Sequence, residues 1–366
     1  MTETPLTLSE KLKRLNRPFA PITKLCQFTD IHWGARNNSQ QHLDDCNEYI
    51  DWFIAKVLIE KPSHIAFLGD WFENRNAINV NTLNASTQAA RKLNALGIPV
   101  IFIVGNHDLY HRQDREVFST DSFADLDNFI IIDEPVSLND EWLATPFIFR
   151  KEYPEMVGAI NTHKYVLGHF EFRDFVVTGD TRLMEHGPDC RDFAKPRYIF
   201  TGHFHKRQTY QNVVYIGNPF PTNYGDAGDA DRGMAVFDVT NDDVYFHNWE
   251  GVPMFFKTRM SRIIGGDCDF PPKSRVRCLL DMDIGYSDIQ TLREELIEEF
   301  QLREFSVEED IAARKELLSE GQELEGQLDL SSLDNTVRQL ITEGVAGGSS
   351  IDPQELIRLY EEIQIV

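Results

Sequence analysis

The sequence predicts an α/β protein built on two mixed sheets that pack against each other. Three features of residues 22–248 indicate this fold. Short apolar runs alternate with helical patterns, the chain opens as strand, helix, strand, and the later strands follow one another through short connections. The short connections argue against a single doubly wound sheet, because its parallel strands need crossover helices between them.

The predicted strands are short segments rich in β-branched and aromatic residues. They cover Ile22–Phe28, His64–Leu68, Val100–Val104, Phe129–Ile132, Tyr165–Leu167, Tyr198–Phe200, Val213–Ile216 and Met234–Phe237. A helix is predicted between the first two strands, where apolar side chains recur at helical spacing: Leu43, Cys46, Tyr49, Ile50, Phe53, Ile54 and Val57. We therefore assign residues 21–252 to the main domain and residues 1–20 to an N-terminal extension.

A small α+β domain is predicted for residues 253–304. Arg275–Met282 has the composition of a strand, and a helix after Ser287 would carry an apolar stripe of Ile289, Leu292, Leu296, Ile297 and Phe300. Residues 305–329 are rich in Glu and poor in large apolar side chains, which predicts a linker.

Two short helices are predicted in residues 330–366. Ser331 and Asp352 are the expected N-caps, and Pro353 would take the first helical position of the second helix. Both helices have an apolar face. That pattern favours docking onto a partner and packing back onto the main domain equally.

Length and composition narrow the class of protein. The 366 residues suggest about two domains, and a hydrophobic share of 42% excludes wholesale disorder. No apolar run is long enough to span a membrane, so we expect a soluble, unexported protein. The five cysteines are odd in number and never at CxxC spacing, so the sequence indicates neither a disulfide framework nor a thiolate zinc site and favours the cytoplasm.

The net charge argues against a nucleic-acid surface spread over the whole molecule. The chain has 36 Lys and Arg against 59 Asp and Glu, a net charge of −23, whereas binding to a nucleic-acid backbone needs cations. Residues 301–366 hold 5 Lys and Arg against 15 Asp and Glu, so much of the acidity lies at the C-terminal end. The basic cluster Lys11–Arg17 is compatible with an exposed amphipathic face or with a nucleic-acid contact.

Five short polar motifs, each directly after a predicted strand, carry the chemistry. They are Asp30-Ile-His32, Gly69-Asp70, Gly105-Asn106-His107-Asp108, Gly168-His169 and Gly202-His203-Phe-His205. Their candidate ligands are two Asp, one Asn and four His without Cys, a set that suits manganese, iron or zinc. Seven ligands are too many for one ion. They suit two ions about 3.5–4 Å apart that share a carboxylate, as in displacement at phosphorus.

In this order the motifs resemble those of the calcineurin-like metallophosphoesterases. The likeness is greatest to the branch that holds the nuclease subunits of the Mre/Rad and SbcC/SbcD recombination complexes and their phage counterparts. It is carried by Asp30–Gly34, Gly69–Phe72, Gly105–Asp108 and Tyr215–Pro219, and it extends through Gly225-Asp226 and Asp231–Gly233 to the terminal helices.

The resemblance implies a four-layer αββα sandwich with a small capping domain, C-terminal partner-binding helices and two metal ions, manganese first and magnesium as the alternative. It implies that one metal is held by Asp30, His32, Asp70 and His205. The other would be held by Asp70, Asn106, His169 and His203, so that Asp70 is the bridge. His107 would be catalytic rather than a ligand, stabilising the transition state or protonating the leaving oxygen.

The implied function is DNA cleavage at double-strand breaks during recombination, as a 3′ to 5′ exonuclease on duplex ends and a single-strand endonuclease. The implied partners are DNA, a second copy bound through the nuclease domain, and an SMC-like coiled-coil ATPase bound by residues 330–366. Two alternatives are a phosphomonoesterase or cyclic-nucleotide phosphodiesterase with the same metals, and a non-catalytic scaffold for the ATPase. A small-substrate enzyme needs no appended C-terminal regions, which favours the nuclease.

Other polar residues have simpler interpretations. His42 is predicted on the surface at the start of a helix, and His64, His163, His186 and His247 are predicted to be structural or exposed. Asp108 would either orient His107 or cap the following turn. Glu73 stands where this branch usually has Asp, which is expected to affect substrate fit more than metal geometry.

Overall fold

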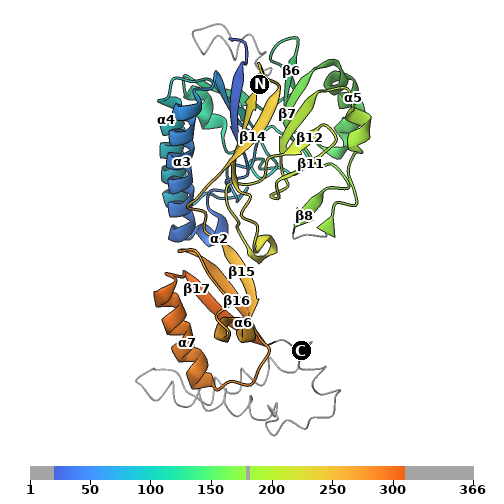
Figure 1. Ribbon diagram of the computed structural model, residues 1–366. Coiled ribbons are helices and arrows are strands. Elements are labelled where there is room, and N and C mark those ends of the chain that lie inside the picture. Colours follow the sequence, from blue (N-terminus) through green and yellow to red (C-terminus); the bar gives the residue numbers. More distant parts are fainter. Residues whose placement is uncertain (1–19, 179–181, 310–366) are drawn as a thin grey trace, which may run out of the picture. The chain divides into compact units, whose positions relative to one another are not determined.

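The computed structural model describes residues 20–178 and 182–309 (Figure 1). The chain divides into two compact units, Met1–Glu308 and Glu309–Val366, and apart from Glu309 every described residue belongs to the first. The predicted extension up to residue 19 and the predicted helices of residues 330–366 lie outside the described residues.

The first sheet is mixed, with the strand order β14-β13-β1-β2-β3-β4. Its strands are β1 (Lys24–Phe28), β2 (His64–Phe67), β3 (Val100–Ile103), β4 (Phe129–Ile132), β13 (Gly233–Asp238) and β14 (Asp243–Asn248). The strands from β1 to β4 run parallel, while β13 and β14 are antiparallel additions. The carboxyl ends of β1, β2 and β3 therefore meet at one edge of the sheet.

The second sheet is also mixed, with the order β11-β12-β10-β7-β6-β5. It comprises β5 (Val136–Ser137), β6 (Trp142–Phe147), β7 (Tyr165–His169), β10 (Tyr198–Gly202), β11 (Gln208–Tyr210) and β12 (Val213–Tyr215). Strands β6, β7, β10 and β12 are parallel. Between β7 and β10 in the sequence, the strands β8 (Val176–Thr178) and β9 (Arg182–Leu183) form a separate two-stranded sheet.

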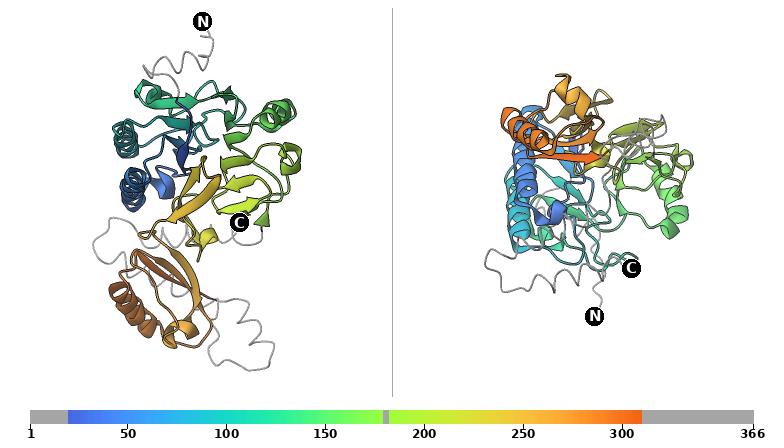
Figure 2. Two further views of the ribbon diagram at one scale, coloured as in Figure 1. Left: turned by 45° about the horizontal axis from the view of Figure 1, so that its top comes forward. Right: turned by 90° about the horizontal axis from the view of Figure 1, so that it is seen from below.

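Helices cover the outer faces of both sheets (Figure 2). The helices α3 (Gln40–Glu60) and α4 (Val80–Asn94) lie on the first sheet, and α5 (Tyr153–Thr162) lies on the second. Helix α3 begins at the N-cap Ser39, whose side chain accepts a hydrogen bond from the backbone of His42, and it buries the predicted apolar stripe, Ile54 being partly buried. Short 3-10 helices occupy Asp121–Asp125, Arg150–Glu152, Cys190–Phe193 and Tyr224–Asp226.

The core between the two sheets is a continuous apolar layer. Ile103 of β3 and Leu68, which directly follows β2, belong to the first sheet's side of this layer. They pack in one cluster with Leu167, Phe200 and Val214 of the second sheet. The layers are therefore helix, sheet, sheet, helix, and the predicted two-sheet fold is confirmed. Each predicted strand of the main domain is observed, whereas helices α4 and α5 and the strands β5, β6, β8, β9, β11 and β14 were not predicted.

A small α+β domain follows Pro253. The strands β15 (Phe255–Arg259), β16 (Arg275–Leu280) and β17 (Glu304–Glu309) form its sheet, with α6 (Met260–Ile264) and α7 (Tyr286–Glu299) beside it. The prediction of a linker from residue 305 is wrong at its start, because β17 belongs to this sheet. Phe305 is buried and Val307 packs on the same core, a period-two pattern that the surrounding Glu residues conceal.

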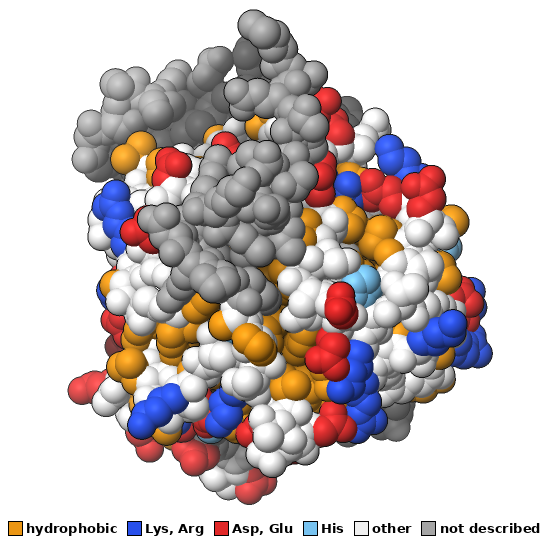
Figure 3. Space-filling model, turned by 90° about the horizontal axis from the view of Figure 1, so that it is seen from above, with side chains coloured by type: hydrophobic (Ala, Val, Ile, Leu, Met, Phe, Trp, Pro, Cys, Tyr) orange, Lys and Arg blue, Asp and Glu red, His pale blue; other side chains and the backbone are white. Residues whose placement is uncertain are grey.

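The surface carries charges of both signs. On the face seen from above in Figure 3, basic and acidic side chains are interspersed around apolar ones in the part that is not grey. None of the helices in residues 20–178 and 182–309 is long and apolar enough to cross a membrane.

Candidate metal centre

The five polar motifs meet at one edge of the sandwich. Three of them follow β1, β2 and β3 of the first sheet. The other two lie at the ends of β7 and β10 of the second sheet, where His169 is the last residue of β7 and His203 follows β10. Two contacts join the second sheet to segments that follow strands of the first: Nδ1 of His169 lies 2.7 Å from the carbonyl oxygen of Leu68, and the amide of Phe147 donates to the carbonyl oxygen of Val104 at 2.9 Å. The packing of the sheets therefore brings together residues that are up to 175 positions apart, from Asp30 to His205.

Four of the candidate ligands have left-handed backbone conformations. The φ angles are 51° at Asp30, 50° at His32, 60° at Asp70 and 89° at His203. For residues other than glycine such angles cost about 1–3 kcal/mol each and persist where the surroundings impose them, often at functional sites. Here the backbone is fixed across the strands, since the amide of Asp30 donates to the oxygen of Gly69 at 2.9 Å.

Two motif glycines leave room for the polar side chains. Gly69 has a φ of +104°, and a Cβ atom there would lie 2.3 Å from Nδ1 of His169. A Cβ atom on Gly105 would lie 2.2 Å from Oδ1 of Asp70. Both contacts are far too short, so glycine is required at each position for the cluster to form.

The first group of ligand atoms comes from Asp30, His32 and His205. These atoms lie within 4.8 Å of one another. The Nε2 atoms of His32 and His205 are 3.1 Å apart, and Oδ1 of Asp30 lies 3.8 Å from Nε2 of His32. All three residues therefore present ligand atoms to one small volume.

The second group comes from Asp70, His169 and His203, again within 4.8 Å. Asn106 completes it, because its Oδ1 lies 3.0 Å from Nε2 of His169 and 2.9 Å from Nδ1 of His203. Oδ2 of Asp70 is 3.3 Å from Nε2 of His169 and 3.9 Å from Nε2 of His32. Asp70 thus lies between the two groups, where a bridging carboxylate is needed.

The charges of this cluster fit two divalent cations. Within the described residues, the ion pairs of Asp30 and Asp70 are with histidines, and none is with Lys or Arg. Burial opposes ionisation of both carboxyls and raises the pKa of Asp30, whereas the charge of His169 holds the pKa of Asp70 well below its usual range. Carboxylate, amide and imidazole donors without a permanent cation are the chemistry of a metal site.

The histidines of the cluster divide into two kinds. Burial would lower the pKa of His32 and His169, but the carboxylates of Glu73 and Asp70 raise the first to about 9, and Asp70 raises the second to about 9. Burial lowers the pKa of His203 to about 3 and that of His205 well below its usual value. Without metals, the cluster therefore balances its carboxylates by protonating two histidines.

Asp108 has neither of the two predicted roles. Its buried carboxylate accepts hydrogen bonds from the backbone amides of Asp70, Trp71, Phe72 and Gly105 at 3.0–3.1 Å. Burial raises its pKa to about 6. Asp108 therefore fixes the two loops that carry Asp70 and Asn106, a role that needs the tertiary structure to be recognised.

His107 and Glu73 form the wall next to the first group. Nδ1 of His107 lies 2.8 Å from the backbone oxygen of Glu73, and the His107 amide donates to Oδ1 of Asp70 at 2.7 Å. The Glu73 carboxylate lies 2.8 Å from Nδ1 of His32, whose Nε2 faces the other ligands. Carboxylates that bind the far nitrogen of a ligating histidine set its tautomer and orientation.

His42 is buried, so the prediction of a surface position is wrong. Its side chain is 2% exposed, its Nε2 lies 2.8 Å from the carbonyl oxygen of His32, and burial lowers its pKa to about 4. His42 precedes Cys46 by four residues and Tyr49 by seven, so it continues the buried stripe of α3. That spacing was the signal in the sequence.

Arg232 supports the ligand loop of His205. This arginine is fully buried, and its guanidinium donates to the backbone oxygen of His205 and to the side chain of Asn218. Asp229 and Asp226 neutralise it at 2.9 and 3.4 Å. The sequence places Arg232 in the motif Asp231–Gly233 but does not reveal this contact.

A cavity of about 260 Å³ opens over the cluster. It is lined by His32, Ala35, Arg36, Asp70, Glu73, His107, His203, His205, Thr222 and Asn223. Candidate ligands from both groups thus share one cavity with His107. The histidines His111, His163 and His247 do not join these ligand groups, and His64 is a buried residue of β2.

Comparison with known proteins agrees with this geometry. Residues 23–207, about half of the chain, match the family described as calcineurin-like phosphoesterase, and the matched segment holds all seven candidate ligands and His107. Exonuclease subunit 1 of Enterobacteria phage T4 is 29% identical over 185 residues, which are 49% of this chain and 53% of that protein. The match thus spans about half the length of this curated relative.

Three solved structures that are similar to this chain share little of its sequence. The phosphoesterase Yfce from E. coli has a TM-score of 0.32 and 14% identity, covering 61% of this chain and 97% of that one. A dimetal phosphatase from Danio rerio has a TM-score of 0.35 and 10% identity, covering 59% and 92%. The nuclease MPE from Pseudomonas putida has a TM-score of 0.29 and 12% identity, covering 60% and 87%.

Proposed function

The chain belongs to the calcineurin-like phosphoesterase family, and on that premise we propose that it is a DNA nuclease dependent on two divalent metal ions. The observation that carries the proposal is the position of the Asp70 carboxylate between two groups of converging ligand atoms. The name of the phage relative, an exonuclease subunit, supports a nucleic acid as the substrate, and we take that nucleic acid to be DNA.

The chain's own residues supply both metal sites. Asp30, His32 and His205 would hold one ion, Asn106, His169 and His203 the other, and Asp70 both. When bound, two such ions activate water and neutralise the charge that grows on the phosphoryl oxygens. We take manganese as the first candidate, since it is among the ions that this mixed oxygen and nitrogen donor set suits, and magnesium as the alternative that the family resemblance implies.

His107 is the proposed catalytic residue. It lines the cavity with the ligands, yet its Nδ1 is bound to the Glu73 backbone oxygen, which leaves Nε2 for the substrate. In the imidazolium form, Nε2 can donate its proton to the leaving 3′ oxygen or a hydrogen bond to a phosphoryl oxygen. The backbone contact keeps the ring in one orientation for this purpose.

Partners are part of the proposal. We assign residues 330–366 to the binding of an SMC-like coiled-coil ATPase, and we propose that two copies of the chain pair through the nuclease domain in the cytoplasm. The support is the pair of apolar helix patterns and the description of the phage relative as a subunit. Deleting residues 327–366 should abolish co-purification with the ATPase and leave the metal content unchanged.

The deciding experiment is hydrolysis by the full chain with manganese. We expect it to degrade end-labelled duplex DNA from the 3′ end and to cut single-stranded DNA, with less activity in magnesium. The control substrates are p-nitrophenyl phosphate and bis(p-nitrophenyl) phosphate. Efficient hydrolysis of these esters with no cleavage of either DNA would instead support a phosphomonoesterase or cyclic-nucleotide phosphodiesterase.

A further inference from the structure

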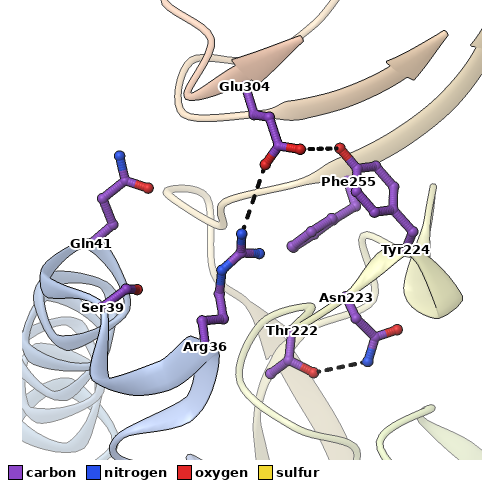
Figure 4. Close-up of a pocket in the computed structure, with 8 residues that line it drawn as sticks. All are labelled: Arg36, Ser39, Gln41, Thr222, Asn223, Tyr224, Phe255 and Glu304. Atoms are coloured by element: carbon purple, nitrogen blue, oxygen red, sulfur yellow. Dashed lines mark hydrogen bonds and ion pairs between the residues drawn. The ribbon is translucent and has the colours of Figure 1, made fainter. Parts of the chain in front are cut away.

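A second pocket adjoins the cavity over the metal ligands (Figure 4). Its volume is about 480 Å³, and it is lined by Arg36, Ser39, Gln41, Thr222, Asn223, Tyr224, Phe255 and Glu304. Arg36, Thr222 and Asn223 also line the metal-site cavity. A polymer bound at the metals can therefore continue into this pocket, whereas a small ester cannot occupy both.

The pocket holds a loosely bound carboxylate. Oε2 of Glu304 lies 3.8 Å from Nη2 of Arg36 and 3.9 Å from Nε of Arg275, and Oε1 accepts a hydrogen bond from the Tyr224 hydroxyl at 3.4 Å. Charge-assisted hydrogen bonds are usually about 2.7–2.9 Å long. The Glu304 side chain is 40% exposed, so this anion is held at a distance and is free to leave.

The arginines around Glu304 outnumber it. The guanidinium carbons of Arg36 and Arg275 both lie 5.4 Å from the centre of the Phe255 ring. Arg275 is almost fully buried and is fixed by a 2.7 Å hydrogen bond to Gln41, and burial together with Arg36 lowers its pKa to about 10. Around Arg275 three arginines, Arg36, Arg275 and Arg303, face two carboxylates, Glu304 and Asp45, and the excess cation leaves room for an anion of higher charge or better fit.

The backbone at Arg36 is strained. Arg36, Asn37 and Asn38 all have φ angles between 55° and 58°. Consecutive left-handed residues are unfavourable for L-amino acids, and Asn tolerates the conformation better than Arg does. The strained segment places the Arg36 side chain where it lines both cavities.

We propose that this pocket binds a phosphate of the substrate strand adjacent to the scissile phosphate. The phosphate replaces the Glu304 carboxylate between Arg36, Arg275 and Tyr224, because guanidinium groups bind phosphate oxygens in the same way as carboxylate oxygens. Glu304 is then a competing internal anion that weakens DNA binding. The inference rests on the proposed nuclease function and adds to it a preference for polynucleotides over small phosphoesters.

Two substitutions with opposite expected effects test the proposal in the full-length protein. Arg36→Asn removes the charge and tolerates the left-handed backbone, so it should raise the KM for a single-stranded oligonucleotide about tenfold. Its effect on bis(p-nitrophenyl) phosphate should be smaller by about that factor. Glu304→Gln should lower the KM for the oligonucleotide severalfold, a gain that damage to the fold would not produce.

The control is Arg197→Asn, which removes an exposed arginine paired with Asp242 at the start of β10, the end of that strand away from His203. It should leave both substrates unaffected. If Arg36→Asn leaves the KM for the oligonucleotide unchanged, as this control should, or if Glu304→Gln raises that KM, the proposal of a phosphate subsite is wrong.

Binding of a fluorescent oligonucleotide to metal-free protein separates this inference from the proposed function. We expect Arg36→Asn to weaken binding and to reduce its salt dependence by about one phosphate contact, with the opposite shift for Glu304→Gln. If oligonucleotide binding depends on Arg36 but the wild-type protein does not hydrolyse DNA, the nuclease function alone would be contradicted. DNA hydrolysis by the wild type, together with an oligonucleotide affinity that neither substitution changes, would contradict the phosphate subsite alone.

Discussion

Two clusters of buried and half-buried charge differ in how their carboxylates are neutralised. At the metal centre, the side chains of Asp30 and Asp70 face histidines. At the contact between the small domain and α3, which we call the interdomain contact, Asp45 forms a two-point ion pair with Arg303 at 2.5 and 2.6 Å. Glu48 pairs there with Lys273 through a single contact between Oε2 and Nζ.

The difference distinguishes a binding site from a structural contact. The carboxylates of the interdomain contact already have permanent cations from the chain, so each is neutralised within the fold and has no capacity left for a metal. The carboxylates of the metal centre have only titratable histidines, so an external cation adds charge that the protein lacks. Four predictions test this comparison, from the largest expected effect to the smallest.

Asp70→Ala should eliminate both metals and all hydrolysis. Its carboxylate lies between the two ligand groups, so neither site keeps its shared anion. Metal content after gel filtration, measured by mass spectrometry, and DNA cleavage with manganese are the two readouts. A variant that retains two ions per chain would contradict the bridging role.

His107→Ala should keep both ions but lower kcat by about 10²- to 10⁴-fold. The residue lines the cavity, and its ring nitrogen groups with His32 and Glu73 rather than with the Asp30 and His205 atoms or the Asp70, His169 and His203 atoms. The same two assays apply, and Asp70→Ala is the matched variant that loses the metals. Wild-type turnover by the His107 variant would overturn its catalytic assignment.

Asp45→Ala should behave in the opposite way to Asp70→Ala. It leaves the Arg303 charge partly buried without its partner, so the free energy of unfolding should fall by about 3 kcal/mol while the metal content stays at two ions. Urea unfolding of the metal-free protein measures the change in the free energy of unfolding, and mass spectrometry measures the metal content. Loss of metal with unchanged stability would show that the two clusters do not differ as described.

Glu73→Ala should weaken metal binding about 10- to 100-fold, the smallest of these effects. The substitution removes the carboxylate that holds Nδ1 of His32 but keeps the backbone oxygen that binds His107. Titration of metal-free protein with manganese measures the change. Glu73→Gln, which keeps a side-chain oxygen facing Nδ1 of His32 but loses the charge, should recover part of the affinity; equal loss in both variants would assign the effect to charge alone.

Much of the site could be predicted because each ligand follows a strand end in the sequence. Runs such as His64–Leu68 are recognisable from composition, and Gly69-Asp70 directly after one has a defined place at the edge of a sheet. The helix α3 was predicted for the same reason, since its buried stripe has a regular period. His42 shows the limit, because a histidine on an apolar stripe has no composition signal of its own.

The supporting contacts could not be predicted. Asp108 binds amides from two loops, and Arg232 reaches the His205 backbone from 27 residues away. Such contacts depend on which loops the sheets bring together rather than on any local pattern. The same is true of β17, whose buried Phe305 is meaningful only once β16 lies beside it.

The sequence by itself determined eight strands of the main domain, the helix α3 and the set of polar residues at the strand ends, because local periodicity and residue type are properties of short segments. Only the tertiary structure decided how the ligands divide around Asp70, which carboxylates lack a permanent cation, and that Arg36 and Glu304 meet in one pocket. These depend on the packing of two sheets and a small domain, which joins residues far apart in the chain.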